Sequence, residues 1–198
     1  GNMTFVFWVS PKTLIGGNNY IIYKEFADDS PTINEYSVRL SNSKIIVKLY
    51  NQTGTTSVSV ISASTIANNS FTFVAFTYNG TNVSIYINGT LDNSTNTNIV
   101  LRKNNNNIAL GFDASDGCVI GPGVGCNTNM TLDEIKLFNR TLSSDQINQI
   151  YQDTRFGYSN VSTIMGNETI NGENWTCEVT PNDAKLDGIL ENNSTTIG

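Results

Sequence analysis

The chain has 198 residues, enough for one well-packed domain or for one domain and a fragment, and it contains no apolar run long enough to span a membrane. Only 14% of the residues are charged and the formal net charge is -6, so the clustered Lys and Arg of a nucleic-acid-binding surface are missing. The chain has no His, which excludes Ser-His-Asp and Cys-His catalytic sites. Asn, Ser and Thr supply the polarity instead, and these residues favour strands and turns over helix interiors.

An alternation of apolar and polar residues with a period of two predicts a series of short β-strands. The Asn79-Gly80 and Asn88-Gly89 pairs mark tight hairpin turns, because both residues of each pair accept a positive φ. Many short strands at this spacing predict an all-β fold, a two-sheet antiparallel jelly-roll sandwich. In chain order, the predicted strands are Met3–Val9, Tyr20–Lys24, Tyr36–Leu40, Lys44–Tyr50, Ser57–Ile61, Phe71–Tyr78, Val83–Ile87, Ile108–Phe112 and Met130–Phe138.

One segment, Ser143 to Gln152, has a helical pattern instead. Ser143 is followed three residues later by Gln146, which is the spacing of a capping box. Ile147, Ile150 and Tyr151 then share one face of the helix. The pattern predicts one short amphipathic helix that packs on the edge of the sandwich as a lid on the core.

The composition changes near Gly157, so we predict a jelly-roll domain over residues 1–157 and an extended C-terminal segment over residues 158–198. This segment holds one convincing strand, Asn174–Thr180, with Trp175, Cys177 and Val179 on one face. About 40 residues with one good strand cannot form a core of their own. The segment is therefore either the start of a second β domain or a connector strand that binds a partner through these three side chains.

Two stretches resemble a known family. Residues 71–91 (FTFVAFTYNGTNVSIYINGTL) resemble the central hairpin of laminin-G-like, concanavalin-A-like lectin/glucanase jelly rolls, and residues 132–151 (LDEIKLFNRTLSSDQINQIY) resemble their closing strand and helix. The opening MTFVFWVSP is also similar to an early core strand of that family. The resemblance covers roughly residues 3–155 and implies two curved sheets that bind carbohydrate, protein or matrix without catalysis. The resemblance also implies a strand pair ahead of the position of Met3. That pair is missing from this sequence, so the sandwich is expected to have an open sheet edge that invites strand addition.

Asn-x-Ser/Thr sequons are abundant in the chain. Chance alone would give roughly 6 in a chain this rich in Asn, Ser and Thr. The excess predicts N-linked glycans at several sites, although some sequons are accidental, and hence an extracellular or cell-surface protein. There are 14 sequons, at Asn2, Asn51, Asn68, Asn79, Asn82, Asn88, Asn93, Asn129, Asn139, Asn160, Asn167, Asn174, Asn192 and Asn193.

The three cysteines fit a secreted chain. Cys118 and Cys126 flank a Gly-rich loop and are predicted to form a disulfide, the alternative being two unpaired thiols. Cys177 is left over, which suggests a bond to another chain or a partner outside this sequence. Zinc is not expected from three cysteines and no His.

Calcium is the candidate cofactor, and the family resemblance implies it at loops of this kind. Asp113 and Asp116 lie in a loop after a predicted strand, and Asp28 and Asp29 lie in another. Hard cations take carboxylate and carbonyl oxygens from such loops. The alternative is that these are solvated turn residues, because Asp favours turns in any case.

A catalytic carboxylate pair is not expected. Asp133 and Glu134 are adjacent, so on a regular strand they point to opposite faces and cannot act together in glycoside hydrolysis. The aromatic residues Trp8, Phe71, Phe73 and Phe76 have core spacing and are predicted to be core rather than a sugar platform.

Two functional classes remain open. The first is a non-enzymatic module for adhesion or recognition at a cell or particle surface, which binds other surface proteins or carbohydrate. The second is a structural subunit of an extracellular filament or surface layer. In that case the C-terminal extension adds a strand to the next copy of the chain.

Overall fold

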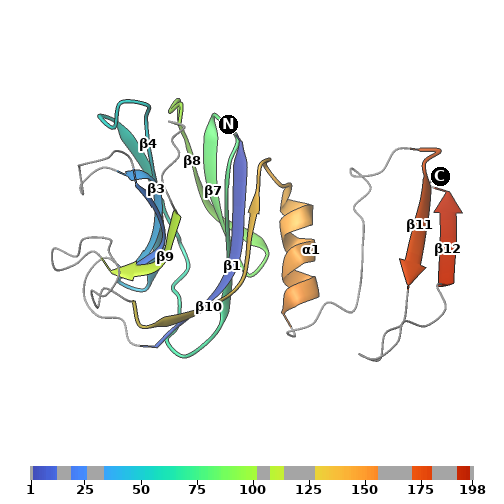
Figure 1. Cartoon of the computed structure of the whole chain (residues 1–198). Coiled ribbons are helices and arrows are strands. Elements are labelled where there is room, and N and C mark those ends of the chain that lie inside the picture. The colour runs from blue at the N-terminus through green and yellow to red at the C-terminus, as the bar shows by residue number, and fades with distance from the viewer. Residues whose placement is uncertain are drawn as a thin grey trace. The chain divides into compact units, whose positions relative to one another are not determined.

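The computed structural model describes residues 2–12, 19–25, 34–101, 108–113, 128–155, 171–179 and 191–196. The chain divides into two compact units, residues 1–159 and residues 160–198. Within the first unit the described residues form ten strands and one helix (Figure 1). These are β1 (Met3–Pro11), β2 (Asn19–Glu25), β3 (Asn34–Ser41), β4 (Lys44–Tyr50), β5 (Ser57–Ile61), β6 (Thr72–Tyr78), β7 (Asn82–Ile87), β8 (Thr90–Asn96), β9 (Ile108–Asp113), β10 (Met130–Phe138) and α1 (Ser144–Thr154).

The strands form two antiparallel sheets of five. Sheet I has the order β10-β1-β6-β7-β8 and sheet II has the order β5-β4-β3-β2-β9. The predicted jelly-roll sandwich is therefore confirmed, and each of the nine predicted strands is present to within one or two residues at its ends. The sequence analysis missed β8, because its sequence TLDNSTN has no alternation of apolar residues.

The core lies between the two sheets, and the face of each β1 residue follows from the alternation along the strand. Phe5, Phe7 and Val9 face the core, where Phe5 stacks on Phe76 with ring centroids 5.1 Å apart. Val6 faces the other way and belongs to a second apolar cluster beneath α1. Both faces of β1 are thus buried, which explains its nearly continuous apolar sequence MTFVFWV.

The expected row of core phenylalanines is divided between three environments. Phe76 lies in the sandwich core and Phe73 lies in the cluster beneath α1. Phe71 is not a core residue, since its side chain is 49% exposed just ahead of β6. Phe73 and Phe76 lie in different clusters because the strand period of two places them on opposite faces of β6.

Helix α1 begins as the sequence predicts. Ser143 Oγ accepts a hydrogen bond from the Gln146 N–H (3.2 Å), and Gln146 Oε1 accepts one from the Ser143 N–H (3.0 Å), which completes the capping box. Ile147 is fully buried against sheet I. The helix packs on the outer face of sheet I rather than on the edge of the sandwich, as Figure 1 shows.

The sandwich is closed along the side where β5 and β8 form the sheet edges. Asn93 Nδ2 donates to the carbonyl oxygen of Ile61 (2.9 Å), which joins β8 to β5. The Asp92 carboxylate accepts hydrogen bonds from the backbone N–H groups of Ala63 and Ser64, the latter at 3.0 Å. Polar side chains therefore connect the two sheets along this side.

The other side, where β9 and β10 form the edges, is open as far as the described residues show. Among the described residues, β9 pairs with β2 only and β10 with β1 only. Leu110 lies opposite Ile22 and Leu137 lies opposite Phe5, so both leucines face the core. Four core-facing residues of these two strands nevertheless remain 38–54% exposed: Ile108, Leu110, Ile135 and Leu137.

The second unit contains a hairpin in place of the single strand that the sequence predicts. β11 (Asn174–Val179) pairs antiparallel with β12 (Glu191–Thr196), from Asn174 opposite Thr196 to Val179 opposite Glu191. The sequence analysis missed β12 because ENNSTT contains no apolar residue. An isolated two-stranded hairpin has only marginal stability in water.

Candidate functional site

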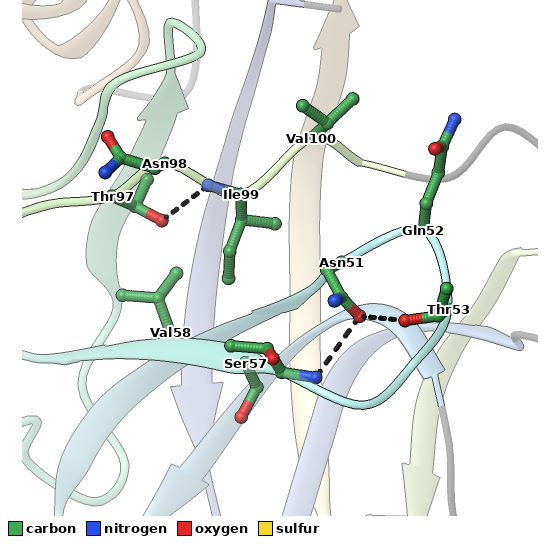
Figure 2. A pocket seen from close by; sticks show the side chains of 10 residues that line it. Asn51, Gln52, Thr53, Ser57, Val58, Thr97, Asn98, Ile99 and Val100 are labelled. Atoms are coloured by element: carbon green, nitrogen blue, oxygen red, sulfur yellow. Dashed lines mark hydrogen bonds between the residues drawn. The ribbon is translucent and has the colours of Figure 1, made fainter.

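A pocket of about 530 Å³ lies between the loop after β4 and the segment after β8 (Figure 2). We call it the Asn51 pocket. The loop is held by one side chain, because Asn51 Oδ1 accepts hydrogen bonds from the backbone N–H groups of Thr55 (3.0 Å) and Thr56 (3.2 Å). The Asn51 N–H also donates to the carbonyl oxygen of Thr56 (2.9 Å), and Gly54 closes the turn with a φ of 72°.

The facing wall of the pocket is formed by Thr97 to Val100. The Thr97 N–H donates to the carbonyl oxygen of Thr81 (2.8 Å), and the Ile99 N–H donates to Thr97 Oγ1 (3.1 Å). The Tyr78 hydroxyl donates to the carbonyl oxygen of Ile99. Burial raises the pKa of Tyr78 above its ordinary value, so this hydroxyl stays protonated and remains a donor. Both walls are therefore anchored before any ligand arrives.

The lining of the Asn51 pocket is uncharged and combines carboxamide, hydroxyl and aliphatic groups. The side chains of Gln52, Thr56, Ser57 and Asn98 make no hydrogen bond within the part of the chain that the structure describes, so their polar atoms are available to a ligand. Gln52 and Asn98 come from the two facing walls (Figure 2). The full lining consists of Asn51, Gln52, Thr53, Thr56, Ser57, Val58, Thr97, Asn98, Ile99 and Val100.

This lining defines what the pocket can do. Carboxamides and hydroxyls donate and accept hydrogen bonds without charge, and the aliphatic side chains accept the apolar face of a ligand. No lining side chain can exchange a proton near neutral pH, so this pocket offers no general acid or base. It suits the binding of an uncharged polar molecule.

A second pocket, of about 220 Å³, lies at the C-terminal end of α1, and we call it the Trp8 pocket. The pairing of β1 with β10 shifts between Val6 and Trp8, and Glu134 has a φ of 49°, which marks a β-bulge in β10. The prediction that Asp133 and Glu134 point to opposite faces is wrong, because both line this pocket after the bulge breaks the alternation. The lining residues are Trp8, Phe71, Asp133, Glu134, Thr154 and Arg155.

Several candidate site residues lie outside the described residues. The predicted Cys118–Cys126 disulfide and the aspartates Asp28, Asp29 and Asp116 belong to this group. Asp113 is the last residue of β9. The residues that the structure does describe contain no group of three or more Cys, Asp or Glu that could hold a metal ion. The calcium site and the disulfide stay predictions.

The candidate partner-binding residues Trp175, Cys177 and Val179 lie on β11 in the second unit. Their backbones pair with Thr195, Asn193 and Glu191 of β12 in that order. A role for these residues in binding a partner stays a prediction.

The sequon asparagines differ in how their side chains are used. Asn51, Asn82 and Asn93 donate hydrogen bonds through Nδ2, the atom that carries an N-linked glycan, to Thr55 Oγ1 (3.3 Å), Asn96 Oδ1 (3.0 Å) and the Ile61 carbonyl (2.9 Å). Asn79 Oδ1 accepts from the N–H groups of Thr81 and Asn82 within its own turn, whereas Asn88 Oδ1 accepts from the Phe73 N–H on β6. Six exposed sequon asparagines have side chains without a hydrogen bond in the described chain: Asn2, Asn68, Asn129, Asn139, Asn174 and Asn192.

Both pockets contain residues that the sequence analysis did not assign to a site. Asn51 was considered only as a sequon, and the facing segment after β8 carries no motif that would single out Asn98 or Val100. The Asn51-Gln52-Thr53-Gly54 turn was visible as a loop between two predicted strands. Only the fold shows that residues 51–57 and 97–100 face each other.

Comparison with known proteins identifies the class. The family model of the Concanavalin A-like lectin/glucanases superfamily, of laminin-G type, matches residues 1–148. The chain belongs to this family, which confirms the resemblance seen in residues 71–91 and 132–151. None of the curated proteins matches the chain. Within the described residues, no helix is long and apolar enough to cross a membrane.

Solved structures with a similar fold include bacterial toxin domains. The binding domain of Paraclostridial Mosquitocidal Protein 1 is 17% identical over 79% of this chain and 38% of its own, with a TM-score of 0.61. The receptor binding domain of botulinum neurotoxin D is 20% identical over 76% of this chain and 37% of its own, with a TM-score of 0.59. The chain thus spans less than two fifths of the length of these domains, and at this identity the similarity shows the fold alone.

Proposed function

We propose that this chain is a non-enzymatic recognition module of an extracellular glycoprotein and that it binds an uncharged polar ligand, a glycan, in the Asn51 pocket. The observation that carries the proposal is the set of unbonded polar side chains on two anchored walls, with no charged residue among them. Preformed walls reduce the entropy that a ligand must lose on binding. The aliphatic side chains of Val58 and Val100 add an apolar surface for the carbon skeleton of a sugar.

The comparisons support a binding role without naming a ligand. The family is a superfamily of lectins and glucanases, and the similar solved structures are described as binding or receptor binding domains. The absence of any titratable side chain in the Asn51 pocket favours the lectin-like over the glucanase-like activity.

Substitution of the two free carboxamides tests the Asn51 pocket. Gln52→Ala and Asn98→Ala are each expected to weaken binding of the best ligand on a glycan array by about tenfold, the loss of roughly one hydrogen-bonding side chain. Gln152→Ala and Asn68→Ala are the matched controls, because both side chains are exposed and lie outside the pocket. Unchanged affinity in the pocket variants, or hydrolysis of the bound glycan by the intact chain, would contradict the proposal.

The sequons give a prediction about glycosylation. In material from the natural source, glycopeptide mass spectrometry is expected to find glycans at Asn68, Asn129 and Asn139, since their side chains are exposed and unbonded. Asn51 and Asn93 are expected to have low glycan occupancy, because their Nδ2 atoms donate hydrogen bonds that a glycan would break. The reverse distribution, or a bare chain of 21.6 kDa, would overturn this part of the account.

A second candidate function, a structural subunit joined to its neighbour by strand addition, rests on the open side of the sandwich. Core-facing Leu110 and Leu137 are about half exposed on two edge strands whose outer backbone groups have no strand partner among the described residues. An added strand would bond to these groups and cover the leucines. The supporting feature of the C-terminal unit is β11, whose sequence alternates Trp175, Cys177 and Val179 and which pairs only with β12 among the described strands. Two strands by themselves are only marginally stable in water.

Light scattering distinguishes this candidate from a monomeric module. If β11 of one copy adds to the open edge of the next, deletion of residues 160–198 converts the assembly to monomers, and so does Leu137→Lys, because a charge on an edge strand opposes pairing. Leu91→Lys is the matched control, since Leu91 is 50% exposed but lies opposite Tyr86 on the helix side of sheet I. A monomeric intact chain would exclude the assembly function.

A further inference from the structure

The Trp8 side chain is held rigidly in its pocket. Trp8 Nε1 donates to Thr154 Oγ1 (2.9 Å), and Thr154 Oγ1 in turn donates to the carbonyl oxygen of Ile150 (2.8 Å) in the last turn of α1. The indole ring contacts the rings of Phe73 and Tyr151, with centroids 5.5 Å and 5.8 Å away. The indole is therefore fixed on one side, while Trp8 also lines the pocket and remains only half buried.

The other pocket residues follow from the strand register. Phe73 lies opposite Trp8 on β6. Phe71, just ahead of β6, lines the same pocket as Trp8. Asp133 lies opposite Trp8 on β10, and the bulge adds Glu134 beside it. The exposed side chain of Phe71 and the two acidic residues thus line the pocket beside the indole of Trp8.

The charges of the pocket are balanced. Glu134 forms an ion pair with Lys136 (2.7 Å), and Arg155 lines the pocket together with the two acidic residues. Asp133 Oδ1 accepts from the Glu134 N–H (2.8 Å), whereas Asp133 Oδ2 makes no hydrogen bond within the described chain. Because two basic groups offset two carboxylates, the pocket has no net charge that would attract a cation or an anion.

We propose that the Trp8 pocket is a second ligand site and that it binds one neutral sugar ring. A pyranose has an apolar C–H face, which packs against the aromatic side chains of Trp8 and Phe71, and hydroxyl groups, which donate to the Asp133 and Glu134 carboxylates. The volume of about 220 Å³ is below the range of sites for larger ligands, about 300–1,000 Å³, and matches a single ring better than an oligosaccharide.

This site is separate from the Asn51 pocket. The two pockets share no residue. Trp8 lies opposite Phe73 at one end of the β1–β6 pairing, whereas Met3 lies opposite Tyr78, whose hydroxyl supports the Asn51 pocket, at the other end. The module therefore has two sites at opposite ends of one strand pair, and the second does not depend on the function proposed for the first.

The indole N–H signal of Trp8 in NMR spectra of the full chain reports on this site directly. The chain has two Trp residues, and a Trp175→Phe variant assigns the signal of Trp8. The probes are methyl glycosides of glucose, galactose and mannose, and N-acetylglucosamine. At least one is expected to shift the Trp8 signal with saturation, and Phe71→Ala and Asp133→Asn are each expected to weaken that binding about tenfold.

Matched variants and probes define the outcomes. Leu91→Ala and Asp145→Asn alter exposed residues outside the pocket and are expected to leave the affinity of the Trp8 pocket for the sugar unchanged. Because Phe71 and Asp133 are exposed, their variants are expected to keep the thermal midpoint of the parent chain. No shift with any sugar at its solubility limit, a shift with tetramethylammonium instead, or release of methanol from a glycoside would each overturn the proposal.

Discussion

The burial of β1 on both faces is the constraint on which the rest of the first unit depends. Val6, Phe7 and Val9 have no exposed side-chain surface, although successive residues point to opposite sides of sheet I. One layer of protein cannot cover both sides, so sheet II must cover Phe7 and Val9 while α1 covers Val6. Burial of each such side chain contributes about 1.5–3 kcal/mol to the free energy of folding, so the packing of both layers on β1 is favourable.

The two pockets arise where this layering ends. Helix α1 is shorter than the sheet that it covers, and the Trp8 pocket lies where the helix stops at Thr154 and Arg155. At the other end of the β1–β6 pairing, the Asn51 pocket lies between two loops that core residues hold in place. Recognition residues are thus placed on loops and a bulge, while the strands and the helix supply a rigid frame.

Sequence patterns with a local cause could be predicted, and those with a distant cause could not. Buried and partly exposed residues alternate along strands such as Lys44–Tyr50, because one face of the strand is buried. The capping box of Ser143 and Gln146 lies within one helical turn. The bulge at Glu134 depends on the register between β10 and β1, which lies more than 120 residues away in the sequence. The local sequence LDEIKLF does not predict it. Likewise β8 is polar and owes its place to backbone pairing with β7 and to the Asp92 and Asn93 bonds to the β5 side.

Native-state hydrogen exchange tests most directly the claim that β1 is buried on both faces while the β9/β10 side of the sandwich stays open. In dilute, monomeric chain, the amides of Val6 and Phe7 are expected to exchange only through global unfolding, because β1 is bonded to β6 and β10 and covered on both sides. Amides of β9 and β10 that point away from β2 and β1 are expected to exchange by local opening, far faster than those of β1. If these outer amides were protected as strongly as those of β1 in the monomer, the sandwich would be closed on that side and the account would be wrong.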